Sequence, residues 1–254
     1  SMRLHSPDRL PCFTSTYGDE GRGEIYWARI AAEKMQAQLN EVESSVSRSI
    51  ETLTDIVWHL DAPTYSPAVI PIWSVMRRAR ESGVPVLLEG QGADELLAGY
   101  VQHAAVYLRS LSLRTLLTPR SVGHFRAFAK TFGHAPLMAW LARLQWPGLL
   151  EAYRRRFGAA GLLVDWNGQD AGRARDSGST YAGVLSDALL HDHSSRVLPG
   201  LLHYGDALSM AHSVETRLPF TDHRLVELVF KELTGSLLRD GQSKWVLRRY
   251  LERR

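Results

Sequence analysis

Residues 84–100, VPVLLEGQGADELLAGY, contain the feature that most restricts the fold of this chain. The run from Val84 to Leu88 is apolar throughout, whereas a strand with one exposed face alternates apolar and polar residues. A strand buried on both faces belongs to a parallel sheet covered by helices, so an α/β fold is predicted. The strand is followed by a turn with Gly90 and Gly92, and then by two adjacent carboxylates, Asp94 and Glu95, that begin an amphipathic helix.

The residues before this strand alternate between strand and helix patterns. Strands are predicted near residues 12–17, 39–43 and 85–89, and helices over residues 25–39, 46–60 and 72–82. In the first two helices apolar residues recur at gaps of three and four, the helical period. This order of elements predicts a parallel sheet in residues 1–100.

The second half of the chain has a different pattern. Residues 96–150 contain no Asp or Glu, six Lys or Arg, and apolar residues at helical spacing. Residues 165–180 are polar and rich in Gly and Ser, which is typical of a linker or mobile loop. Residues 101–254 are therefore predicted to be a mainly helical region, separate from the α/β region of residues 1–100.

Composition restricts the class of protein. The chain has 254 residues, is 44% hydrophobic and carries a formal charge of only +3, so charge gives no indication of nucleic-acid binding. The single cysteine, Cys12, cannot form an internal disulfide, which favours a reducing, cytoplasmic location. No apolar stretch reaches the roughly 18–20 residues of a membrane span, so no membrane partner is expected.

The glycine turn and its two acids have three interpretations. The acids can simply complement the positive end of a helix. A dinucleotide fingerprint does not fit, because Glu95 replaces its third glycine and the next acid is Glu151. If Mg²⁺ lies between Asp94 and a polyphosphate, the carboxylate becomes a ligand rather than a repulsive neighbour, and the glycines let the backbone come close.

Several ordered stretches, taken together, are more specific than this turn. LLEGQGADELLAGY resembles a loop of asparagine synthetase and its glutamine-dependent amidotransferase relatives. GEIYWARIAAEK, VWHLDAPTYSPAVIP, LLHYGDALSMAHSVETRLPFTDHRLVELV and DGQSKWVLRR resemble further segments of that family in the same order. The resemblance covers most of the chain and identifies it as part of the family's synthetase domain.

The resemblance implies an ATP pyrophosphatase (adenine-nucleotide α-hydrolase) type of fold and a ligase activity. The family uses ATP and Mg²⁺ to activate a carboxylate as an acyl-AMP, and ammonia from a glutaminase domain or subunit then forms the amide, as in asparagine biosynthesis. Asp94 matches the family's magnesium-pyrophosphate aspartate, and Gly90 and Gly92 match its loop glycines. The implied partners are a small carboxylate acceptor and a glutaminase.

The loop departs from the family pattern at one catalytic position. Gln91 replaces the acid that assists ammonia attack, and an amide cannot act as a base, although it can orient a substrate. Glu89, two residues before Gln91, supplies a carboxylate close to the position of the family's acid. It is predicted to carry any general-base role. The acceptor is therefore left open, and free aspartate is not assumed.

Three residues further along have both a structural and a functional interpretation. Glu215 and Arg217 in SVETR form either a structural ion pair, which we favour, or part of a nucleotide cleft shared with Asp94. Lys244 is a substrate or phosphate contact, or, more in keeping with its Arg-rich helix, a solvated side chain. His191, His193 and His203 match no metal template and are interpreted as structural.

The family's first strand and its Ser-Gly-Gly-x-Asp-Ser loop have no match, and neither has the later segment with its catalytic lysine. In the family's sheet that strand lies between the strands predicted here near residues 12–17 and 85–89. We therefore expect a fragment, one half of a split enzyme or a non-catalytic descendant acting as an interaction protein. The chain alone is expected to be inactive, and a homo- or hetero-oligomer is expected to complete the sheet.

Overall fold

The computed structural model describes residues 10–16, 24–43, 49–64, 68–110, 130 and 181–253. The chain divides into two compact units. Unit 1 comprises residues 1–89 and 200–217, and unit 2 comprises residues 90–199 and 218–254. Because a segment near residue 200 returns to the first unit, neither unit is continuous in sequence. None of the helices in the described ranges is long and apolar enough to cross a membrane.

Unit 1 begins with a β–α–β arrangement. Strand β1 (Pro11–Thr16) pairs in parallel with β2 (Gln38–Glu43), and Cys12 lies opposite Leu39. Helix α1 (Glu24–Met35) connects them and buries Ile25 and Ala32. The helix predicted over residues 25–39 is thus too long, because Gln36 adopts a left-handed φ of 51° and the chain turns into β2. Asn40 fixes this pair further, since its side-chain amide donates to the Cys12 carbonyl at 3.3 Å.

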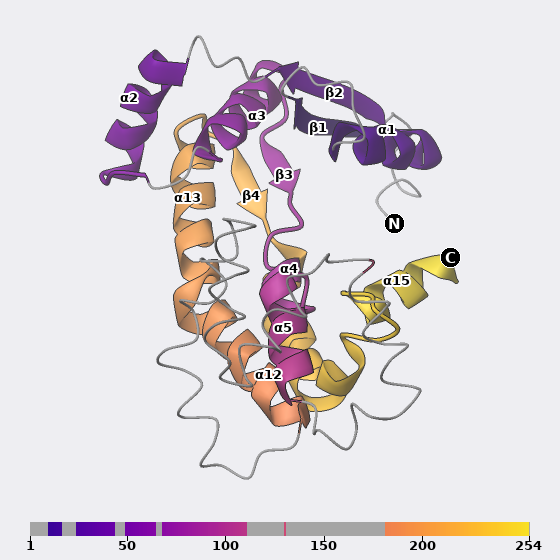
Figure 1. Ribbon diagram of the computed structural model, residues 1–254. Coiled ribbons are helices and arrows are strands. Elements are labelled where there is room, and N and C mark those ends of the chain that lie inside the picture. Colours follow the sequence, from indigo (N-terminus) through magenta and orange to yellow (C-terminus); the bar gives the residue numbers. More distant parts are fainter. Residues whose placement is uncertain are drawn as a thin grey trace, which may run out of the picture. The chain divides into compact units, whose positions relative to one another are not determined.

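The rest of unit 1 packs around helix α3 (Val69–Glu81), which contributes residues to both of its cores. Helices α2 (Ser49–Leu60) and α3 precede strand β3 (Val86–Leu88), which pairs in parallel with β4 (Glu215–Arg217) (Figure 1). Helix α13 (Leu198–Met210) leads back into this unit. One core joins α2, α3 and α13 through buried Ile56, Leu60, Val69, Trp73 and Leu208. A second core centres on Met76, Ala79 and Val214, against which Phe13 and Leu87 pack.

Unit 1 contains two separate two-stranded sheets in its described residues. Both β1 and β3 pack against α3, but they are not hydrogen-bonded to each other. A groove of about 800 Å³ lies between them, walled by residues 10–15 and by Val84 and Val86–Glu89. Val86 and Leu88 are 37% and 51% exposed, so the prediction that this strand is buried on both faces is wrong for the described residues. Its apolar side chains instead border the groove.

Unit 2 is built from helices in its described residues. It begins with the one-turn α4 (Ala93–Leu96) and α5 (Val101–Ser110), followed by α12 (Tyr181–His191) and the π-helical η3 (Asp192–Arg196). After η4 (Pro219–Thr221) come α14 (His223–Leu228), η5 (Val229–Leu233), η6 (Thr234–Ser236) and α15 (Trp245–Glu252). Their shared core includes buried Leu96, Leu185, Leu189, Val229 and Leu237.

These observations confirm the predicted fold class, an α/β region with parallel strands followed by a mostly helical remainder. The three predicted strands are present, although β3 has only three residues. Most of the basic segment at residues 101–150, and the whole predicted linker at residues 165–180, lie outside the described residues. The proposed boundary near residue 100 stays a prediction.

Candidate functional site

The loop that follows β3 enters α4 through Gly92. Gly92 adopts a left-handed φ of 87° as the N-cap residue of this helix. A Cβ atom at this position would lie 3.1 Å from Thr221 Cγ2 and 3.7 Å from Phe220 Cβ. Glycine is therefore needed here for both its backbone conformation and the close packing of η4. By contrast, a Cβ at Gly90 would meet no atom within 4 Å among the described residues.

Asp94 forms an ion pair with a residue far along the chain. Its Oδ1 atom lies 2.8 Å from Nζ of Lys244, and the two side chains are 37% and 27% exposed, respectively. Lys244 is the N-cap residue of α15 and adopts a left-handed φ of 52°. Its backbone N–H donates to the Leu97 carbonyl at 3.2 Å, which ties α15 to the loop. The structure thus places a partly exposed carboxylate and ammonium side by side.

Gly99 provides the space for this ion pair. A Cβ at position 99 would lie 2.5 Å from Lys244 Cε and closer still to the Asp94 carboxylate, so any side chain would overlap both residues. The Gly99 N–H also donates to the Asp94 carbonyl at 2.9 Å, which folds residues 94–99 into a closed turn. Gly99 was not among the residues identified from the sequence.

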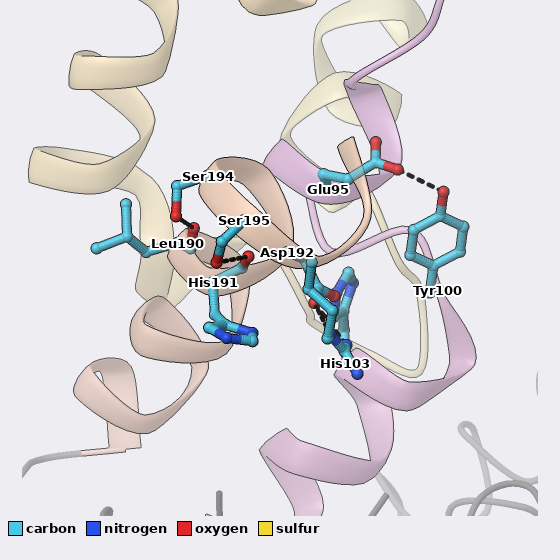
Figure 2. A network of polar contacts seen from close by, with 9 residues as sticks. Glu95, Tyr100, His103, Leu190, His191, Asp192, Ser194 and Ser195 are labelled. Atoms are coloured by element: carbon cyan, nitrogen blue, oxygen red, sulfur yellow. Dashed lines mark hydrogen bonds and ion pairs between the residues drawn. The ribbon is translucent and has the colours of Figure 1, made fainter. Parts of the chain in front are cut away.

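Glu95, unlike the partly exposed Asp94, points into the core of unit 2. The residue is 1% exposed, and its Oε1 accepts a hydrogen bond of 2.5 Å from the Tyr100 hydroxyl (Figure 2). Burial, followed by the hydrogen bond to Glu95, raises the pKa of Tyr100 well above its ordinary value. The hydroxyl therefore remains a donor throughout the physiological pH range.

A second buried polar cluster lies beside Tyr100. The His103 ring centroid is 5.5 Å from the Tyr100 ring, and His103 Nε2 lies 2.9 Å from Asp192 Oδ2 (Figure 2). Arg196 donates from Nε to Asp192 Oδ1 at 2.6 Å. Burial opposes ionisation of Asp192, but the hydrogen bonds from His103 and Arg196 outweigh it and lower the pKa of its carboxyl. Asp192 is therefore an ionised, paired carboxylate at neutral pH.

Glu89, Glu215 and Arg217 lie in unit 1. Glu89 is half-buried, and its Oε1 is buried without a hydrogen-bond partner among the described residues. Burial raises the pKa of this carboxyl. Its backbone N–H donates to the Arg217 carbonyl at 3.0 Å, and both residues line the groove described above.

Glu215 and Arg217 do form an ion pair, with Nε and Oε1 2.8 Å apart. Both side chains are more than half exposed and belong to the same strand, so the pair contributes little to stability. A cleft shared by these residues and Asp94 stays a prediction, because they belong to different units.

The structure therefore brings together three of the stretches identified in the sequence. Gly92 and Asp94 come from the glycine loop, Thr221 from the segment after SVETR, and Lys244 from DGQSKW. Gln91 is half-exposed in the same loop. Tyr100 and His103 were not predicted from the sequence, in which the only signal was that Tyr100 follows Glu95 by five residues at the end of the glycine-loop stretch.

A family model and several known proteins match most of this chain. Residues 1–254 match the family model described as asparagine synthase. The chain is 30% identical to a "putative asparagine synthetase (glutamine-hydrolyzing)" of Mycobacterium tuberculosis, over 98% of this chain and 39% of that protein. It is 23% identical to "asparagine synthetase (glutamine-hydrolyzing) 1" of Bacillus subtilis, over 96% of this chain and 40% of that protein. "Amidase chyE" of Penicillium rubens is 24% identical over 88% of this chain and 37% of its own length. The chain spans about two fifths of the length of these relatives.

Proposed function

This chain belongs to the asparagine synthase family, and we propose that it carries the ATP-dependent, carboxylate-activating part of an amide-forming enzyme. In this reaction a carboxylate oxygen attacks the α-phosphorus of ATP and pyrophosphate leaves. Ammonia then attacks the acyl carbon, AMP leaves with the bonding electron pair, and the nitrogen loses a proton. The chain's contribution is to bind and orient the charged reactants.

The observation that carries this proposal is the Asp94–Lys244 pair. A partly exposed ion pair contributes at most about 1 kcal/mol to stability. Stability alone is therefore a weak reason for the turn of residues 94–99 and the start of α15 to be joined at this pair. A carboxylate beside an ammonium is, however, what a magnesium-polyphosphate needs: an oxygen ligand for the cation and a positive charge for a phosphate oxygen.

The residues present fit Mg²⁺ better than a cation held entirely by protein. The described residues contain no group of three or more His, Cys, Asp or Glu that is arranged for a metal. Mg²⁺ typically keeps several waters and takes one or two carboxylates together with substrate phosphates. Asp94 would hold the ion and Lys244 would contact phosphate. When bound, Mg²⁺ would neutralise charge on the leaving pyrophosphate.

Glu89 is the proposed base for the amide-forming step. Its Oε1 is buried without a hydrogen-bond partner in the part of the chain that the structure describes. With a raised pKa, this carboxylate can accept a proton from nitrogen more readily than an exposed one can. Gln91 is proposed to orient the acceptor through its amide. The proposed nitrogen source is a glutaminase, the acceptor is a small carboxylate, and the proposed location is cytoplasmic.

The test compares Asp94→Asn and Lys244→Met with Glu227→Gln and Lys231→Met in the full-length protein. Glu227 and Lys231 form an exposed ion pair of 3.0 Å in the same unit and serve as the control. Pyrophosphate exchange into ATP is measured with a panel of carboxylates that includes aspartate. The site variants are expected to lose roughly 100-fold in rate with little change in melting temperature, and the control variants to lose neither.

Two results would contradict this proposal. Parallel losses of exchange and stability in the Asp94 variant would favour a structural role for the pair. No exchange by the full-length wild type with any carboxylate would favour the rival function, a non-catalytic interaction protein with this fold.

We also propose that the groove between β1 and β3 receives a β-strand, from elsewhere in the protein or from a partner, that completes the sheet. The supporting observations are two strands on one helix that do not pair with each other, and the exposed side chains of Val86 and Leu88 in β3, which line the groove. Cys12 lines this groove and is the only cysteine in the chain. If a strand fills the groove in solution, a thiol reagent should modify Cys12 in the folded protein much more slowly than in the urea-unfolded protein. Equal rates would contradict the proposal.

A further inference from the structure

The one-turn helix α4 needs support from outside itself. It has four residues, and its N-cap residue makes no side-chain capping hydrogen bond. A helix this short is not stable on the strength of its own hydrogen bonds. The position of Asp94 therefore depends on what holds its neighbours.

Glu95 provides the polar contact that anchors α4 to the rest of the unit, in addition to the apolar packing of Leu96. Successive residues on a helix point about 100° apart, so an outward Asp94 is compatible with an inward Glu95. Glu95 is 1% exposed, and the Tyr100 hydroxyl donates to it at 2.5 Å. A buried carboxylate is strongly disfavoured without a donor, so this hydrogen bond decides whether the inward orientation is stable.

Tyr100 is itself held in place by surrounding groups. Its ring lies against His103, which is fully buried and bound to Asp192 (Figure 2). Between Glu95 and Tyr100 the backbone is also closed by the hydrogen bond from Gly99 to Asp94. The Tyr100 hydroxyl is thus presented to Glu95 from a fixed direction.

From this geometry we propose that Tyr100 is a positioning residue for Asp94. Its hydroxyl holds Glu95 in the core, which fixes α4 and so orients the carboxylate of Asp94 toward its cation and Lys244. This inference rests on the proposed role of Asp94 as the magnesium carboxylate. Tyr100 does not itself contact a reactant in this proposal.

The test measures cation binding in the full-length protein, with Mn²⁺ as a spectroscopic substitute for Mg²⁺ and with ATP present. Tyr100→Phe is expected to weaken Mn²⁺ affinity roughly five- to tenfold, the size of one lost ordinary hydrogen bond. Tyr107→Phe, which removes a hydroxyl from a half-buried tyrosine packed on the same core, is expected to change it less than twofold. Measurements are made well below the melting temperature of each variant.

Glu95→Gln separates positioning from charge. The amide oxygen still accepts from Tyr100, so affinity should stay within about twofold of wild type if position is what matters. Equal losses in Glu95→Gln and Tyr100→Phe would overturn the inference, because the charge of Glu95 would then explain both. If Tyr100→Phe does not fold, Glu95→Ala, which removes the acceptor of the same hydrogen bond, takes its place, and unchanged Mn²⁺ affinity in that variant would overturn the inference.

Failure of the positioning role can be distinguished from failure of the proposed function. If Asp94→Asn abolishes Mn²⁺ binding while Tyr100→Phe leaves it unchanged, the positioning role fails and the proposed function stands. If Asp94→Asn leaves Mn²⁺ affinity unchanged, Asp94 holds no cation, and both proposals are overturned.

Discussion

Replacing Gly99 by alanine would perturb the Asp94–Lys244 pair without removing either charge. The new Cβ would lie 2.5 Å from Lys244 Cε and 2.6 Å from Asp94 Cγ. Atoms cannot approach this closely, so either the two side chains move away or the backbone of the turn shifts. The substitution therefore changes where the charges are and leaves the composition of the site intact.

The size of the effect follows from these two responses. Inserting a methyl group into closely packed surroundings costs about 1–3 kcal/mol. Loss of a partly exposed ion pair alone costs at most about 1 kcal/mol. Displacing a ligand group by about 1 Å can reduce activity by as much as about 100-fold. Gly99→Ala should therefore reduce ATP-dependent function far more than it reduces stability.

Calorimetric titration of MgATP and thermal unfolding of the full-length protein measure these two effects. At about 2–4 °C per kcal/mol, melting should fall by about 2–12 °C, while MgATP affinity should fall at least about tenfold. Gly235→Ala is the control, because a Cβ there meets no described atom within 4 Å and should change neither quantity appreciably. Unchanged MgATP affinity in Gly99→Ala would refute the reasoning, since the displaced pair would not be the nucleotide site.

Two further predictions concern buried carboxyl groups. Because burial raises the pKa of Glu89 in the folded protein, its ionisation destabilises the fold as pH rises above about 4.5. Glu89→Gln should therefore melt at a higher temperature than wild type at pH 7 but not at pH 4, and should slow amide formation while sparing acyl-AMP formation; a lower melting temperature at pH 7 would contradict this. Asp192→Ala should lower the free energy of unfolding by about 3 kcal/mol in urea titrations, because it removes the carboxylate to which the buried His103 ring is bound. The wild-type contribution should be present above about pH 4 and disappear as pH falls through the lowered pKa of Asp192, and a loss no larger than that of the exposed Glu227→Ala would contradict the assignment.

The periodicity of the sequence was sufficient to predict the parallel strands but not their ends. Leu39 continues the helical spacing of α1, yet it lies in β2 because Gln36 turns the chain. Periodicity cannot detect a single left-handed residue. Strand β4 was not predicted because Glu215–Arg217 has no apolar alternation, and it forms through long-range pairing with β3.

The site was predictable where one residue's chemistry was distinctive, and not where a role depends on tertiary contacts. Asp94 and Gly92 were identified from the loop itself. Lys244 was interpreted mainly as a solvated side chain, because its contact with Asp94 arises only when α15 begins at the Leu97 carbonyl. Gly99 was missed because the space it provides is defined by these two side chains.

The structure also answers the question that the adjacent acids Asp94 and Glu95 pose. If both acids only complemented a helix dipole, they would need a helix long enough to have one, and α4 has four residues. Instead each carboxylate has its own partner, Lys244 on the outside and Tyr100 on the inside. The inward acid anchors the turn and the outward acid presents a charge beside an ammonium. Two acids at this junction are therefore better explained by two separate partners, Tyr100 for the inward acid and Lys244 for the outward acid that we propose as a cation ligand, than by helix capping.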